Sequence, residues 1–200
     1  MMEPRRRVWG SWPEPGELER SVVTIGVFDG FHRGHVALVE AALAAGTRRG
    51  SPTVLLTFDP HPLAVLAPAQ APRQLLPVDD RVEHAFALGV DCVVVLPFTA
   101  ELAEQSATDF VEQGLVGRMG VESLVVGSNF RCGRGGEGDV DHLRRAGRRH
   151  GFDVRVVDLV RRGERTCSST EVRRALAAGD VHDAFDVLGR HDPRIAAAAG

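Results

Sequence analysis

Two histidines in one glycine-rich stretch are the residues of this chain best suited to chemistry. Residues 26–35 read GVFDGFHRGH, so His32 and His35 lie three positions apart, where an apolar run gives way to an Ala/Leu-rich segment. The first N–H groups of a helix have no partner within the helix, and the helix dipole favours negative charge there. Two imidazoles add donors that can be neutral or cationic near pH 7. The pattern predicts a phosphate site.

Two other interpretations of the histidine pair are open. The pair could lie on the surface without a ligand, or it could contribute to a zinc site. Zinc needs three or four ligands, and no well-spaced Cys or His partners follow. Gly34 removes a side chain that would block a close backbone approach, and Gly26, Asp29 and Gly30 lie just upstream. This context favours phosphate.

A second polar cluster reads SSTEVR at residues 168–173. Hydroxyl groups at the beginning of a helix normally cap it, and capping alone would explain Ser169 or Thr170. Three hydroxyl residues exceed that need, and Arg173 follows about one turn later. Hydroxyls, unpaired N–H groups and a guanidinium together favour a second polyphosphate-binding element.

Two further loops carry candidate binding residues. Residues 127–138 hold a series of glycines, which is typical of a binding loop or of a flexible surface connection; Asn129 and Arg131 are the better functional candidates. Residues 57–62 read TFDPHP, so two prolines hold His61 rigidly. Such a segment suits a pocket wall, although a structural corner explains it almost as well.

Alternating apolar and amphipathic segments must position these four loops. The apolar runs predict strands, the segments between them predict helices, and residues 60–77 are too rich in proline for either. The predicted strands cover residues 22–25, 53–58, 91–96, 123–126 and 154–159; the predicted helices cover 36–48, 79–88, 106–118, 139–150, 171–178 and 181–188. This alternation predicts an α/β fold with a parallel sheet covered on both faces, and its loops should lie at one rim, at the carboxyl ends of the strands.

Composition excludes several classes of protein. The 200 residues fit one domain of ordinary size, and 44% hydrophobic content with a net charge of −3 suggests neither a nucleic-acid nor a membrane partner. The chain has no lysine, which excludes a Walker-type P-loop. Cys92, Cys132 and Cys167 are widely spaced, as in reduced cytosolic proteins, so we expect a cytoplasmic location.

Four motifs in this order resemble one known family. GVFDGFHRGH at 26–35, TFDPHP at 57–62, GSNFRCG at 127–133 and CSSTEVR at 167–173 are similar to the adenylyltransferase module of the prokaryotic bifunctional riboflavin kinase/FAD synthetases. The resemblance covers roughly residues 18–190. It implies a Rossmann-like three-layer α/β/α sandwich of the nucleotidyltransferase superfamily. It also implies transfer of AMP from ATP to FMN, giving FAD and pyrophosphate, with Mg²⁺ held mainly by the ATP phosphates.

The resemblance also implies roles for individual residues. The implied catalytic residues are His32, His35, Asn129, Ser168, Thr170 and Arg173. The implied ATP-binding residues are Gly26, Phe28, Asp29, Gly30, His32, Gly34, His35, Ser168, Ser169, Thr170 and Arg173. The implied FMN-binding residues are Asp59, His61, Pro62, Asn129, Phe130 and Arg131.

The chain departs from the family pattern in two places. Cys132 stands where the family often has an aromatic residue, which bears on the shape of the flavin pocket. The family also continues into a riboflavin kinase module, whereas here residues 1–188 form the expected domain and 189–200 an Ala-rich tail, so we expect no riboflavin kinase activity. The oligomeric state is not predicted.

Other functions are open. One alternative is a related nucleotidyltransferase that acts on a modified flavin, or on another phosphorylated small molecule such as phosphopantetheine or glycerol 3-phosphate. The other is a non-catalytic relative that binds flavin or nucleotide.

Overall fold

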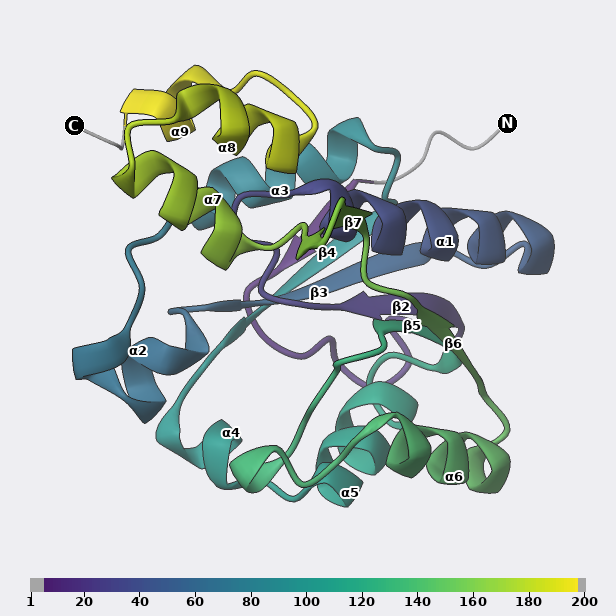
Figure 1. Cartoon of the computed structure of the whole chain (residues 1–200). Helices are drawn as coiled ribbons and strands as arrows, with labels where there is room; N and C mark the ends of the chain where they lie inside the picture. Colours follow the sequence, from purple (N-terminus) through teal and green to yellow (C-terminus); the bar gives the residue numbers. More distant parts are fainter. Residues whose placement is uncertain (1–5, 198–200) are drawn as a thin grey trace.

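A six-stranded parallel sheet forms the centre of the computed structural model, which describes residues 6–197 (Figure 1). Every neighbouring pair of strands in it is parallel. The order across the sheet is β1 (Arg7–Trp9), β4 (Cys92–Pro97), β3 (Thr53–Asp59), β2 (Ser21–Ile25), β5 (Val121–Gly127) and β6 (Asp153–Val157).

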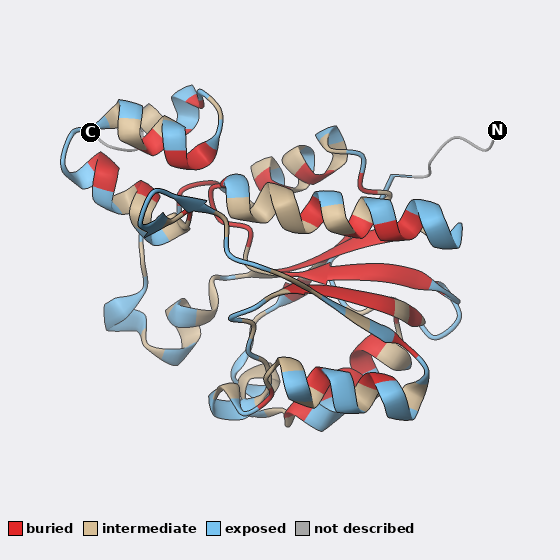
Figure 2. Ribbon diagram, turned by 45° about the vertical axis from the view of Figure 1, so that its right-hand side comes forward, coloured by how far each residue is buried: buried red, intermediate tan, exposed pale blue. Residues whose placement is uncertain are grey.

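Helices cover both faces of this sheet, so the predicted three-layer α/β fold is confirmed. α1 (Arg33–Arg49) and α3 (Val78–Ala87) lie on one face; α5 (Ala107–Asp109), the π-helical turn η2 (Phe110–Val116) that continues it, and α6 (Val140–His150) lie on the other (Figure 1). Side chains alternate between the two layers. Val22 packs towards α1 and Val23 towards η2, and the four inner strands of the sheet, β2 to β5, are mostly buried (Figure 2).

The loops after β2, β3 and β5 all leave the sheet on the side of the strands' carboxyl ends, because the strands are parallel. The chain runs from β2 through α1 to β3 on one side, and crosses from β4 to β5 on the other side of β2. The strand order therefore reverses at β2, and crevices at such a switch point are the usual ligand sites of open α/β sheets. The loop that ends at His32, and leads into the first turn of α1 with His35, begins there.

The C-terminal helices pack beside α3. A short hairpin of β7 (Arg161–Arg162) and β8 (Arg165–Thr166) leads into α7 (Ser169–Ala177) and α8 (Val181–Leu188). Leu75 and Leu76, just before α3, pack into one apolar cluster with these helices. α9 (Pro193–Ala197) follows within the expected tail, and Ile195 is fully buried in the same cluster. The domain boundary at residue 188 stays a prediction.

Several short elements were not expected. The prediction of irregular structure over 60–77 is wrong in part, because α2 (Pro62–Leu66) and the 3₁₀ turn η1 (Pro68–Gln70) form there. Pro62 occupies the first turn, where a missing N–H costs nothing, and His61 Nδ1 accepts a hydrogen bond from the Leu63 N–H. β1, α4 (Ala100–Glu104) and the 3₁₀ turn η3 (Arg134–Gly136) are also additional to the prediction.

Candidate functional site

The loop between β2 and α1 has an unusual backbone conformation. Phe28, Gly30 and Phe31 all have positive φ, at 54°, 81° and 45°. Left-handed conformations of non-glycine residues cost about 1–3 kcal/mol each and persist only where the surroundings enforce them. Here the two phenylalanines are buried with their rings stacked, 5.4 Å between centroids. The buried Phe28 side chain supports the loop, so its predicted role in ATP binding would have to use its backbone.

His32 and His35 form a stacked pair above this aromatic base. Their ring centroids are 3.7 Å apart and their planes differ by 24°. The His35 ring also packs against Phe28, 5.0 Å between centroids. Both Nδ1 atoms are buried without a hydrogen-bond partner. A Cβ atom at Gly34 would come within 3.1 Å of the His32 ring, so this glycine lets the pair adopt its arrangement.

Both imidazoles are neutral at physiological pH. Burial, with Arg190 and Arg173 nearby, lowers the pKa of His32 from 6.5 to about 4. Burial, His32 and Arg190 lower the pKa of His35 well below 6.5. A neutral ring still donates one N–H, so the pair can hydrogen-bond an anion, and the surrounding arginines supply the positive charge.

No side-chain cap and no acidic residue occupies the beginning of α1. His32 is the residue that precedes the helix, its side chain makes no capping hydrogen bond, and the first turn contains no acidic residue. The free N–H groups and the helix dipole therefore favour negative charge at the same place as the histidine pair.

The second polar motif lies against this loop, as its phosphate-binding interpretation requires. Ser168 caps α7 by accepting from the Glu171 N–H, at 3.2 Å. Ser169 Oγ donates to the Asp29 carbonyl oxygen, at 2.7 Å. Thr170 is exposed. The first turn of α7 thus lies against the β2–α1 loop, although the roles of these hydroxyls in ATP binding stay predictions.

Asp29 joins the two motifs. Its carboxylate is buried, accepts from the Leu75 and Leu76 N–H groups at 2.9 and 3.0 Å, and pairs with the Arg173 guanidinium. Arg173 also donates from Nε to the Arg73 carbonyl oxygen, at 2.7 Å. The carboxylate is therefore engaged within the protein and positions Arg173, and direct contact of Asp29 with ATP stays a prediction.

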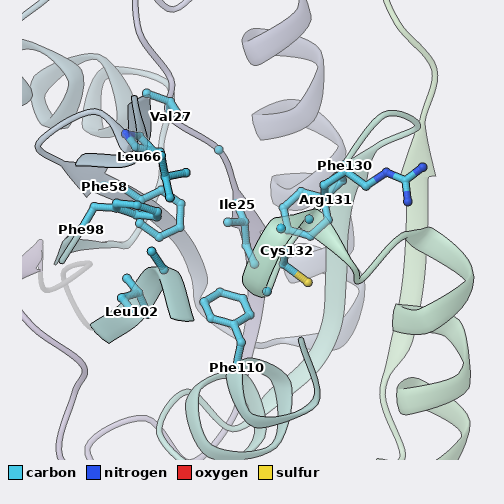
Figure 3. Close-up of a pocket in the computed structure, with 16 residues that line it drawn as sticks. Ile25, Val27, Phe58, Leu66, Phe98, Leu102, Phe110, Phe130, Arg131 and Cys132 are labelled. Carbon is cyan, nitrogen blue, oxygen red and sulfur yellow. The ribbon is translucent and has the colours of Figure 1, made fainter. Parts of the chain in front are cut away.

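An apolar cavity of about 380 Å³ opens on the opposite side of the β2 terminus (Figure 3). Aromatic rings and small residues form most of its wall. In Figure 3, Phe58 and Phe98 lie on one side, Phe130 on the other and Phe110 at the base. The lining residues are Ile25, Gly26, Val27, Phe58, Pro62, Leu66, Phe98, Leu102, Ala103, Phe110, Phe130, Arg131, Cys132, Gly133, Gly135 and Gly136.

Three of the predicted FMN-binding residues line this cavity: Pro62, Phe130 and Arg131. The Arg131 side chain extends away from it (Figure 3), and its guanidinium lies 3.7 Å from the Asp139 carboxylate. The other three predicted residues lie elsewhere. Asp59 pairs with Arg81, His61 caps α2, and Asn129 is exposed in a neighbouring groove.

Cys132 forms part of the cavity wall. Burial, together with Glu137 and Asp139, raises the pKa of its thiol to about 11. The thiol is therefore protonated at physiological pH and contributes a small, uncharged surface to the wall.

The sequence did not point to Arg81, which is almost completely buried. Its guanidinium donates to the carbonyl oxygens of Val27 and Phe58, at 2.9 and 3.1 Å, and pairs with Asp59 at 3.2 Å. It therefore joins the ends of β2 and β3, and with them the two sides of the site. One signal in the sequence could have indicated it: Arg81 lies one helical turn before Ala85, so both residues belong to the buried face of α3. Phe98, Leu102 and Phe110 were also missed.

Comparison with known proteins identifies the family. The FAD synthetase family matches residues 14–171, most of the chain. This chain belongs to the FAD synthetase family. Its motifs and its fold agree with that membership, and the resemblance noted in the sequence is confirmed.

Curated relatives are longer than this chain. The bifunctional riboflavin kinase/FMN adenylyltransferase of Escherichia coli K12 is 37% identical over 171 residues, which are 86% of this chain and 55% of that protein. The protein of the same name from Pseudomonas fluorescens is 39% identical over 169 residues, 84% of this chain and 54% of its own length. The chain thus spans about half the length of the curated relatives it matches.

Solved structures support the fold. A macrolide-efflux protein from Streptococcus pneumoniae has a TM-score of 0.78 at 25% identity, over 92% of this chain and 61% of its own. A pantoate-beta-alanine ligase from Francisella tularensis, complexed with β-γ ATP and β-alanine, has a TM-score of 0.52 at 12% identity, over 88% and 73% of the two chains. The second likeness concerns the fold alone.

Within 6–197, no helix is long and apolar enough to cross a membrane. In the same range, no group of three or more His, Cys, Asp or Glu side chains could hold a metal ion.

Proposed function

We propose that this protein transfers AMP from ATP to FMN, giving FAD and pyrophosphate. One observation carries the proposal. The 26–35 and 167–173 motifs, with the neutral histidines and Arg173, form a polar cradle on one side of the end of β2. The aromatic cavity lies on the other side. Gly26–Val27 forms part of the cavity wall and comes only a few residues before His32. FAD synthesis needs such a pair of neighbouring sites, one for a triphosphate and one for a planar apolar ring.

On the polar side, the residues act by orientation and by stabilising charge. An oxygen of the FMN phosphate attacks the α-phosphorus of ATP, and the bond to the β-phosphate oxygen breaks to release pyrophosphate. The nucleophile is already an anion, so no strong base is required. His32, His35 and the first N–H groups of α1 would donate to the phosphate oxygens as charge develops. Arg173, held by Asp29, would add positive charge.

Mg²⁺ fits this site only as part of the substrate. The carboxylate at the base of the cradle, Asp29, is already engaged by two backbone N–H groups and Arg173. We therefore propose that the ion enters with the ATP phosphates. When bound, it would neutralise phosphate charge and help to orient the phosphates.

On the apolar side, the cavity suits the isoalloxazine ring. Phe58, Phe98 and Phe130 offer aromatic surfaces, and stacking of a base on an aromatic side chain contributes about 1–3 kcal/mol. The names of the relatives support FMN as the second substrate. The predicted roles of Asn129, His61 and Pro62 in holding the flavin phosphate and the isoalloxazine belong to this proposal.

The direct test is incubation with Mg·ATP and FMN, following FAD and pyrophosphate by chromatography. We expect both products in equal amounts, and none from His32→Ala within the same time. Parallel reactions replace ATP with CTP, and FMN with riboflavin or another phosphorylated small molecule.

Each alternative gives a different result. FMN binding without FAD formation would contradict the proposal and favour a non-catalytic flavin-binding protein. A product from another phosphorylated acceptor, but not from FMN, would favour a related nucleotidyltransferase. We further propose that the protein acts in the cytoplasm, where ATP is abundant and where its three cysteines would stay thiols.

A further inference from the structure

The Arg190 side chain extends from the C-terminal helices to the β2–α1 loop, just before His32. It follows Gly189, which ends α8 with φ of 81°. Its guanidinium donates to the Phe31 carbonyl oxygen at 2.7 Å and to the Gly30 carbonyl oxygen at 2.9 Å. These two carbonyls belong to residues with positive φ, directly before His32.

A buried carboxylate holds Arg190 in this position. Asp192 is 2% exposed, and its Oδ2 atom lies 2.9 Å from Arg190 Nη2. Arg194 donates to the other oxygen of this carboxylate from its backbone N–H and its Nε, both at 3.2 Å. His84, on α3, lies 3.3 Å from Arg190 and 3.5 Å from Asp192. Two groups thus orient the Arg190 guanidinium towards the loop: Asp192, which follows α8, and His84 on α3.

Arg190 also acts on the histidines through its charge. It is among the causes that lower the pKa of both His32 and His35, together with burial. The other charged groups that act on the pair are Arg173, beside His32, and Arg81, beside His35. Arg190 therefore affects the histidine pair in two ways: it hydrogen-bonds the backbone before His32, and its charge lowers the pKa of both rings.

We propose that Arg190 is a positioning residue for the histidine pair: it holds the Gly30–Phe31 backbone in the conformation that stacks His32 on His35. This inference rests on the proposed function for its importance to turnover. It assigns a role in the phosphate site to a residue outside 14–171, the range that the family matches. A lysine could supply the charge, but its single ammonium group cannot reproduce the planar fork that serves two adjacent carbonyls and a carboxylate.

The test compares Arg190→Gln and Arg190→Lys with Arg162→Gln. Arg162 is a matched control, because it pairs with two carboxylates of α8, Asp183 and Asp186, and is not among the residues that hold Arg190 or the loop. Two quantities are measured: the pKa values of His32 and His35 by NMR titration, and kcat and KM for ATP in FAD formation.

We expect Arg190→Gln to raise the pKa of His32 from about 4 towards 6.5 and to lower kcat/KM for ATP at least tenfold. Arg190→Lys should leave the pKa of His32 low, because the positive charge remains. It should nevertheless lose most of the activity, because lysine cannot make both hydrogen bonds to the loop carbonyls. Arg162→Gln should change the His32 pKa little and kcat/KM by less than about threefold.

Three results would overturn the inference: His32 and His35 titrating as in the parent protein in Arg190→Gln, full activity in Arg190→Lys, or an equal loss in Arg162→Gln. If the parent protein makes no FAD, the proposed function fails. The titrations, with ATP binding measured by calorimetry, still test the positioning role. If Arg190→Gln does not fold, Arg190→Lys decides it.

Discussion

The two sides of the site are built in different ways. The polar cradle comes from two short stretches of chain, 26–35 and 167–173, and the functional groups of each stretch lie within a few residues of one another. The apolar cavity takes its wall from β2, β3, α2, the segment after β4, α4, η2 and the loop after β5. A phosphate site can be encoded locally, because backbone N–H groups and a helix terminus supply much of it. A ring-binding site needs surfaces that only the tertiary fold brings together.

Removal of either histidine should break the polar side alone. We expect His32→Ala and His35→Ala each to lower kcat/KM by a hundred- to a thousandfold, the loss of about 2.7–4 kcal/mol typical of one donor to developing charge. FMN affinity, measured by quenching of flavin fluorescence, should stay unchanged. Turnover close to that of the parent protein in either variant would contradict the assignment, and equal loss of FMN affinity would contradict the separation of the two sides.

The buried histidines should also make stability depend on pH. Because the folded state lowers the pKa of His32 to about 4, it binds fewer protons than the unfolded chain, whose histidine titrates near 6.5. The free energy of unfolding should therefore fall as the pH decreases from 6.5 to 4, by roughly 3 kcal/mol from this residue.

Comparison with His32→Gln isolates that contribution, since other groups titrate in the same range. Denaturant unfolding at several pH values should give a shallower pH dependence for His32→Gln. Parallel curves for the two proteins would mean that His32 is not held neutral by the fold.

Filling the cavity should affect only the apolar side. Ala103 lines the cavity from α4, so Ala103→Trp should weaken FMN binding by about tenfold or more, about 1.4 kcal/mol. ATP binding should not change. Glu104→Trp is the matched control, because the neighbouring Glu104 is exposed and faces a different groove. An equal effect of both substitutions on FMN would show that the flavin binds elsewhere.

Cys132 should matter least. Its protonated thiol is one small part of the wall, so Cys132→Ala should change FMN affinity by at most about fourfold, near the 0.8 kcal/mol of one buried methylene group. Titration of FMN into the variant measures it. A loss of a hundredfold would instead make this position decisive for flavin recognition.

The contrast between the two sides explains what could be read from the sequence. The β2–α1 and α7 motifs were predicted because their residue types, spacing and glycines lie within short ranges, and the strands because continuous apolar runs such as 53–58 are typical of buried parallel sheets. Arg81 and Arg190 could not be predicted, since their partners are backbone carbonyls many residues away. α2 was missed because Pro62 interrupts a helical pattern in the interior but is compatible with the first turn. The neutral state of His32 depends on burial and on two distant arginines, which no local pattern shows.

A crystal structure with FMN and a non-hydrolysable ATP analogue would test most directly whether the two sides form one active site. We predict the isoalloxazine ring in the cavity between Phe58 and Phe130, the triphosphate against His32 and His35, and the FMN phosphate directed across Gly26 towards the α-phosphorus. A flavin outside this cavity, or a triphosphate without contact to the histidine pair, would contradict the account.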